Sequence, residues 1–130
     1  MLTKDGMKDV IRSAYSARVH GDVDGVVSAF SDQATFEMNT PGDSTQGREA
    51  IRDALAGFVQ TLRYEDWKET ALIVDDNQAA IRWQAKITNI KANRSHLFDC
   101  LDFIEFSGDR ISRLYHTIDT AAFAALLAPN

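Results

Sequence analysis

Hydrophobic residues in the first sixty positions recur at the three- and four-residue spacing of helices. A first helix is predicted over residues 7–19, ending at His20-Gly21, because glycine commonly ends helices. Asp22 is a candidate N-cap for a short second helix. Its inward positions are Val23, Val26, Val27 and Phe30. A third helix is predicted after Gly47, and the positions it would bury are Ala50, Ile51, Ala54, Leu55, Phe58, Val59 and Leu62.

The second half of the chain alternates hydrophobic and polar residues, as strands do. The predicted strands are residues 34–38, 64–74, 78–90, 95–106 and 110–119. A loop is predicted at residues 40–44, and Thr120 or Asp119 would cap a final helix over residues 121–128. Helices followed by a meander of strands predict one α+β domain over residues 1–130. In this domain the N-terminal helices pack on the concave face of a curved, antiparallel sheet.

Two ionisable side chains lie on the hydrophobic faces of the last two strands. These faces carry Phe98, Cys100, Asp102, Ile104 and Phe106 on one strand, and Ser112, Leu114, His116 and Ile118 on the other. Both faces point into one core only if the turn at residues 107–109 has an odd length or a bulge. With Ile104 opposite Leu114, Asp102 lies opposite His116, with Cβ atoms roughly 5 Å apart. A buried acid and imidazole are costly unless paired, and such groups often carry function.

Composition and charge restrict the classes of partner. The 130 residues are 45% hydrophobic and 25% charged, as in an average soluble domain. The net charge of −5 argues against nucleic acid or an anionic membrane as a partner, because both bind basic patches. The chain has no apolar segment approaching the ~20 residues of a membrane-spanning helix. Residues 1–7 also lack the apolar stretch of a signal peptide or anchor.

Cysteine and histidine usage adds two further expectations. Cys100 is the single cysteine, which excludes an internal disulfide and is typical of a reducing compartment, so a cytoplasmic location is expected. His20, His96 and His116 fall on different predicted elements without the spacing of metal ligands. We therefore expect neither a metal site nor a metal-dependent reaction.

Four short segments occur in an order that is typical of a known family. They are His20–Asp24, Phe30–Glu37, Gly47–Ile51 and Gly108–Ile111. Together they resemble the nuclear transport factor 2-like superfamily, and more narrowly its SnoaL-like members, over nearly the whole chain. Relatives include polyketide cyclases, ketosteroid isomerases and limonene-epoxide hydrolases. The resemblance implies a cone with a pocket between helices and sheet, and a homodimer formed through the outer sheet face. Fold alone names no reaction.

Ketosteroid isomerases carry a catalytic aspartate after their first strand, and Met38 occupies that position here. Methionine accepts no proton, so that reaction by that route is not expected. Asp102 matches the oxyanion-binding aspartate of those enzymes. Tyr15 is nearest to the tyrosine of their first helix, although its spacing to Gly21 is one residue short.

Limonene-epoxide hydrolases resemble the chain at Asn39, the position of a water-holding asparagine, and at Arg82, the arginine of their Asp-Arg-Asp arrangement. Gln84 and His116 replace the two carboxylates, and only His116 could act as a base. SnoaL-type cyclases use a carboxylate in the late strands, where Asp102 or His116 would have to act. The chain therefore departs from every one of these templates.

The strand over residues 78–90 allows two orientations. The resemblance turns Arg82 and Gln84 into the pocket and leaves Trp83 and Ile87 for a dimer interface. The hydrophobic pattern alone favours the reverse, with Arg82, Gln84 and Lys86 in solvent. Here we follow the resemblance and expect Arg82 and Gln84 to bind ligand.

The resulting hypothesis is a SnoaL-like protein that binds a small, mostly apolar molecule, for which a cyclic compound is one candidate. The expected lining is Phe58, Val59, Phe98, Cys100, Leu114 and Ile118, and Tyr15 is either a hydrogen-bond donor to the ligand or part of the helix core. His116 would be the general base, and Asp102 would orient it or, if protonated, donate a hydrogen bond to an oxyanion. Arg82 and Asn39 would hold a carbonyl or a water. Isomerisation, cyclisation or dehydration of this kind needs no cofactor. The alternative is a non-catalytic ligand-binding protein or a dimeric scaffold of the same fold.

Overall fold

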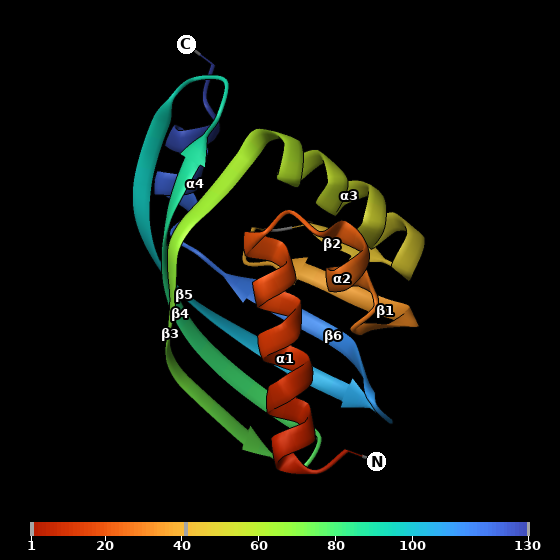
Figure 1. Ribbon diagram of the computed structural model, residues 1–130. Helices are drawn as coiled ribbons and strands as arrows, with labels where there is room; N and C mark the ends of the chain where they lie inside the picture. Colours follow the sequence, from red (N-terminus) through yellow and green to blue (C-terminus); the bar gives the residue numbers. More distant parts are fainter. Residues whose placement is uncertain (1, 41, 130) are drawn as a thin grey trace.

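Six strands form one curved sheet in the order β2-β1-β6-β5-β4-β3 (Figure 1). The computed structural model describes residues 2–40 and 42–129. The strands are β1 (Phe30–Met38), β2 (Ser44–Gln46), β3 (Leu62–Asp75), β4 (Gln78–Asn89), β5 (Arg94–Ser107) and β6 (Arg110–Thr117). Neighbouring strands are antiparallel except β1 and β6, which pair in parallel. The predicted α+β class and the meander of long strands are confirmed.

The helices lie mainly on the concave side of this sheet (Figure 1). They are α1 (Lys4–Val19), α2 (Val23–Val27), α3 (Arg48–Thr61) and α4 (Thr120–Leu127). The start of α2 follows from local chemistry, because the Asp22 carboxylate accepts a hydrogen bond from the Gly25 amide at 3.0 Å. Gly21 has a φ of +72°, which lets the chain reverse between α1 and α2. None of the described helices is long and apolar enough to cross a membrane.

Several element boundaries differ from those predicted. Phe30 and Leu62 are buried as expected, but each is the first residue of a strand rather than part of a helix. Ala50 and Ala54 on α3 are exposed, so the buried face of this helix is narrower than predicted. The cap of α4 is Asp119, which accepts a hydrogen bond from Ala122. The predicted loop at residues 40–44 gives way to β2 at its end, and its proline lies outside the described residues.

The last hairpin has the predicted register. Ile104 faces Leu114 and Asp102 faces His116, with a bulge between Glu105 and Phe106. This irregularity supplies the extra residue that the facing pattern requires. Asp102 and His116 are consequently buried, with exposed fractions of 1% and 8%.

The orientation of β4 is the reverse of the one we expected from the resemblance. Trp83 and Ile87 point into the core, with exposed fractions of 1% and 0%. Arg82 lies on the outer face, where its guanidinium makes two hydrogen bonds to the Asp99 carboxylate at 3.0 and 2.6 Å. Gln84 donates to the same carboxylate at 3.3 Å. The expectation that Arg82 and Gln84 line the pocket is wrong, because strand alternation turns them to the outer face when Trp83 and Ile87 are buried in the core.

Candidate functional site

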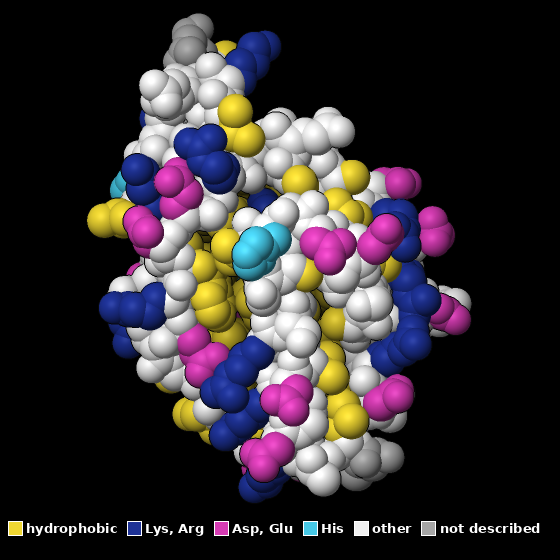
Figure 2. All heavy atoms as spheres, viewed as in Figure 1, with side chains coloured by type: hydrophobic (Ala, Val, Ile, Leu, Met, Phe, Trp, Pro, Cys, Tyr) yellow, Lys and Arg dark blue, Asp and Glu magenta, His cyan; other side chains and the backbone are white. Residues whose placement is uncertain are grey.

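A cavity of about 140 Å³ lies between the helices and the concave face of the sheet. Much of its wall is apolar and includes Phe30, Phe36, Met38, Leu55, Phe58 and Leu114. Figure 2 shows hydrophobic side chains at the floor of a hollow beside α1. A buried apolar cavity of about 150 Å³ is known to accept benzene, so this one has room for a ring-sized group. The rest of its wall carries polar side chains, among them Tyr15, Arg18, Asp102 and His116.

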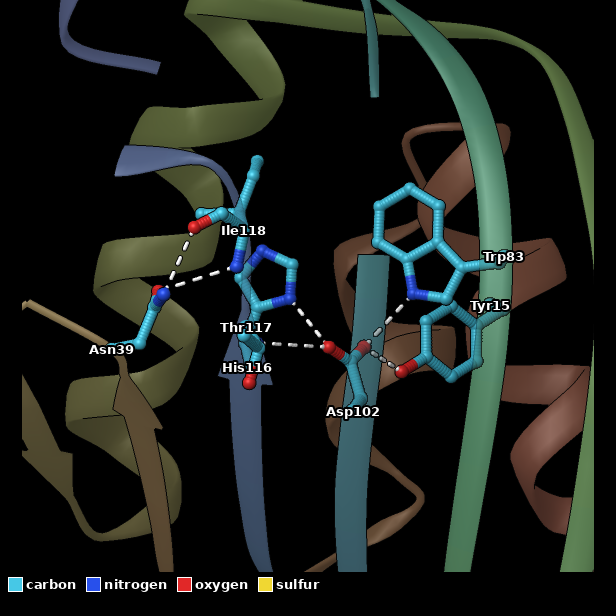
Figure 3. A network of polar contacts seen from close by, with 7 residues as sticks. All are labelled: Tyr15, Asn39, Trp83, Asp102, His116, Thr117 and Ile118. Carbon is cyan, nitrogen blue, oxygen red and sulfur yellow. Dashed lines mark hydrogen bonds and ion pairs between the residues drawn. The ribbon is translucent and has the colours of Figure 1, made fainter. Parts of the chain in front are cut away.

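Asp102 on β5 is the centre of a hydrogen-bond network (Figure 3). The Tyr15 hydroxyl from α1 donates to Oδ2, and Trp83 Nε1 from β4 donates to the same oxygen at 2.9 Å. Oδ1 contacts His116 Nδ1 at 2.6 Å and the Thr117 amide at 3.4 Å. Hydrogen-bond donors thus surround both oxygens, which is how a carboxylate can be buried. Protein groups engage both oxygens, so neither is directed at a ligand to which a protonated Asp102 could donate a hydrogen bond. The arrangement therefore favours the orienting role of Asp102 over the oxyanion-binding role.

His116 on β6 is fixed by contacts on several sides. Its Nδ1 faces the Asp102 carboxylate, and its ring lies parallel to Trp83, with centroids 5.9 Å apart and an interplanar angle of 7°. The Phe36 ring lies 6.4 Å away. With the proton on Nδ1 directed at the carboxylate, Nε2 carries a lone pair, and no described protein group hydrogen-bonds it. Since His116 also lines the cavity, Nε2 is the atom available to a ligand.

Tyr15 supports the acid rather than acting on a ligand. Burial raises the pKa of Tyr15 well above its usual value, and the negative charge of Asp102 raises it further. Tyr15 therefore stays protonated near neutral pH, and its hydroxyl group donates a hydrogen bond to Asp102. Trp67 stacks on the Tyr15 ring with centroids 5.5 Å apart, which helps to hold the phenol in place.

Arg18 is a cavity residue that the sequence analysis missed. Its guanidinium carbon lies 3.9 Å from the centre of the Tyr64 ring, and its Nη2 atom is buried without a hydrogen-bond partner. Burial lowers the pKa of Arg18, and Tyr64 partly offsets this effect. One signal could have identified it: Arg18 lies three residues after Tyr15 and four after Ala14, which places a charge on the hydrophobic face of a helix.

Some of the other predicted pocket residues line the cavity and others do not. Phe58, Leu114 and Tyr15 line it together with Asp102 and His116. Three other apolar candidates, Phe98, Cys100 and Ile118, are buried in the core without lining it. Sharing a strand face with the site was therefore not sufficient to place a residue at its surface.

Asn39 has a structural function in place of the predicted water-holding one. Its side-chain amide donates to the Ile118 carbonyl at 2.9 Å and accepts from the Ile118 amide at 3.2 Å (Figure 3). Its own backbone amide donates to the His116 carbonyl at 3.1 Å. Asn39 therefore fixes the strand end beside His116, and these two hydrogen bonds hold its side chain against Ile118.

No three His, Cys, Asp or Glu side chains within residues 2–40 and 42–129 are grouped so that they could hold a metal ion. The site consists of an acid-oriented imidazole and a partly buried guanidinium on the wall of one largely apolar cavity. Chemically, this arrangement can accept a proton at Nε2 and can bind a negatively charged group at Arg18.

Comparison with known proteins identifies the family. Residues 11–114 match the model of the SnoaL-like domain. An NTF2-like protein of unknown function from Burkholderia pseudomallei aligns with a TM-score of 0.83 at 15% identity, over 95% of this chain and 98% of that one. TerC co-crystallized with polyporic acid aligns with a TM-score of 0.80 at 15% identity, over 93% and 97%. An LEH-like epoxide hydrolase from M. tuberculosis aligns with a TM-score of 0.79 at 17% identity, over 95% and 90%. No curated protein matches the chain. The predicted resemblance is confirmed at the level of family and fold.

Proposed function

Because the chain belongs to the SnoaL-like domain family, we propose that its cavity binds a small, mostly apolar organic molecule and that His116 transfers a proton on it. The observation that carries this proposal is the 2.6 Å contact between His116 Nδ1 and Asp102 at the wall of the cavity. An imidazole that a buried carboxylate holds in this way is oriented to act as a general base through Nε2.

The proton balance of such a reaction closes within the site. Nε2 of His116 accepts a proton from a C–H or O–H group of the ligand, and the electron pair of that bond stays on the ligand. The resulting imidazolium is stabilised by Asp102, whose position is fixed by Tyr15 and Trp83. Nε2 then returns the proton to another atom of the same molecule, which gives isomerisation or cyclisation, or to a departing hydroxyl group, which gives dehydration. His116 ends each cycle in its starting state.

Two further observations support this reading. Met38 lines the cavity at the position where the isomerases have an aspartate, so the base is assigned to His116. TerC, a protein of the same fold, was co-crystallized with a small organic acid, polyporic acid. A pocket for a small organic molecule is therefore compatible with this fold.

Deuterium exchange tests the proposal without knowledge of the natural substrate. A panel of cyclic ketones and 1,3-diketones in D2O is followed by proton NMR, with and without the protein. We expect at least one compound to exchange faster with the wild type, and His116→Gln to slow that exchange by about 100-fold or more. Gln84→Ala, on the outer face, is the matched control and should exchange like the wild type. Equal exchange by wild type and His116→Gln would remove His116 from the mechanism.

We also propose that the protein is a homodimer in which the outer face of the sheet is covered. Leu97, Leu101 and Phe103 on this face have exposed fractions of 76%, 54% and 41%. Large hydrophobic side chains grouped on one exposed sheet face are typical of an interaction surface. The resemblance of the sequence to SnoaL-like proteins implies pairing through this face, which supports a second copy of the chain as the partner.

A further inference from the structure

Arg18 differs from most other arginines of the chain in lacking an acidic partner. The arginines that pair with an aspartate or glutamate are Arg12, Arg48, Arg52, Arg63, Arg82 and Arg113. Among the described residues no carboxylate affects the pKa of Arg18, and its buried Nη2 atom makes no hydrogen bond. Arg18 as a whole is partly buried, but a buried guanidinium nitrogen without a hydrogen bond is costly, so its presence on a cavity wall requires an explanation.

Tyr64 compensates only part of this cost. The guanidinium lies over the Tyr64 ring, with Cζ 3.9 Å from the ring centre, and such a contact is favourable for a cation. It leaves the Nη2 hydrogens unused, and guanidinium groups remain charged in proteins. The cavity therefore contains a positive charge with unused hydrogen-bond donors, and a ligand is the group that can satisfy them.

Aromatic rings connect Arg18 with His116 along one wall. The Tyr64 ring lies 5.8 Å from the Trp83 ring at 29°, and Trp83 lies 5.9 Å from His116 at 7°. Arg18 is thus at one end of this aromatic wall and the proposed base is at the other. Trp83 itself is almost completely buried, so a bound molecule would lie in the cavity beside these rings, with one end at the guanidinium and the other at Nε2.

We propose that the ligand of this cavity is a small, planar, aromatic or conjugated monocarboxylate whose carboxylate pairs with Arg18. The planar fork of a guanidinium matches a carboxylate in two parallel hydrogen bonds. The two carboxylates on the cavity wall are engaged elsewhere, because Asp102 accepts hydrogen bonds from its own donors and Asp43 is exposed. The charge of Arg18 is therefore left for one negative charge on the ligand. This inference rests on the proposed ligand-binding function and assigns its substrate class.

Matched acids and amides test this assignment. The probes are benzoate, trans-cinnamate and 2-naphthoate, each compared with its neutral carboxamide by calorimetric titration against the wild type. For at least one ring size we expect the carboxylate to bind about tenfold more tightly than the amide or better, since a charged hydrogen bond replaces a neutral one. If every amide binds as well as its carboxylate, or if no carboxylate binds, the proposal is wrong.

Substitutions then locate the preference. Arg18→Met keeps the length of the side chain and should lower carboxylate affinity to that of the amide, with amide affinity unchanged. Arg18→Lys should keep part of the preference. Arg82→Met removes an arginine from the outer face and should bind all probes like the wild type. Retention of the full preference by Arg18→Met would overturn the proposal.

Two readouts separate this inference from its alternatives. Without ligand, Arg18→Met should be at least as stable as the wild type, because a partly buried charge with an unpartnered Nη2 has been removed; a purely structural Arg18 would make this variant less stable. His116→Gln should retain the carboxylate preference, since binding does not require proton transfer. If His116→Gln exchanges deuterium normally while Arg18→Met loses the preference, the proposed base is wrong and the carboxylate site still stands.

Discussion

The indole of Trp83 lies parallel to the imidazole of His116, at 5.9 Å between ring centres and an angle of 7°. The same indole donates its Nε1 hydrogen to Asp102, which in turn contacts His116 Nδ1. Trp83 thus restrains the imidazole twice, through its ring face and through the carboxylate. A base held in this way keeps one ring orientation before a ligand arrives.

Replacing Trp83 with phenylalanine should therefore weaken both stability and proton transfer. The substitution leaves Asp102 with one fewer donor, and a buried acceptor that loses a partner costs about 1–3 kcal/mol. Trp67→Phe is the matched control, because the Trp67 Nε1 atom is buried without a hydrogen-bond partner. Urea unfolding should show a larger loss for Trp83→Phe than for Trp67→Phe. Equal losses would mean that the bond to Asp102 contributes nothing measurable.

Two aspartates on β5 allow a comparison of buried and exposed charges. Asp102 has an exposed fraction of 1%, whereas the side chain of Asp99 on the opposite face is 43% exposed. Asp102→Asn should lower the free energy of unfolding by about 3–5 kcal/mol, since it breaks a buried charged network. Asp99→Asn should cost about 0–1 kcal/mol, because its pair with Arg82 is exposed to solvent. Chemical denaturation of both variants checks this difference, which similar losses would contradict.

The pairing of Asp102 with His116 could be predicted because it depends on local rules. Strand alternation defines the two faces, and the need for both faces to point inward requires an irregular turn. The bulge between Glu105 and Phe106, followed by Gly108 at a φ of +63°, supplies that irregularity. A register of this kind is a property of adjacent strands, so it can be read without knowledge of the rest of the fold.

The orientation of β4 was predicted wrongly because positional resemblance was preferred to the hydrophobic pattern. Turning Arg82 inward would have buried a guanidinium and exposed Trp83, which costs more than the reverse. The place of Arg18 on the hydrophobic face of α1 could be read from the sequence, but its position over the Tyr64 ring could not, since Tyr64 and Trp83 are distant from it in the sequence. Whether a core residue reaches the cavity also depends on distant parts of the chain. Phe98 lies on the same strand face as Asp102 but packs against Phe123 of α4, with ring centres 6.2 Å apart.

The buried thiol of Cys100 provides a prediction for alkaline conditions. Burial raises the pKa of Cys100 from 9.0 to about 12, with a further contribution from Asp102. The unfolded chain releases the thiol proton at lower pH than the folded chain, so this group favours folding below about pH 9 and loses that effect as pH rises towards 12. The loss amounts to at most about 4 kcal/mol.

Cys100→Ala removes this titration while other groups continue to titrate in both proteins. At about pH 8 the variant should be less stable by about 1 kcal/mol, because it leaves a small cavity. At about pH 11 the difference should shrink or reverse, since only the wild type has lost the thiol contribution. Urea unfolding at both pH values measures it. A stability difference that does not change with pH would contradict the raised pKa.

The proposed dimer can be tested by placing a charge on the outer face of β5. Leu101 and Phe103 share this face, and a two-fold interface joins the same surface patch of both copies. Leu101→Asp would therefore bury a carboxylate and oppose like charges across the interface. We expect light scattering with size-exclusion chromatography to show a dimer for the wild type and a monomer for Leu101→Asp. Leu127→Asp on α4, at an exposed position away from this face, should remain dimeric. A wild type that is monomeric at micromolar concentration would rule out the dimer, because the leucine and phenylalanine side chains of this face would then remain exposed to solvent.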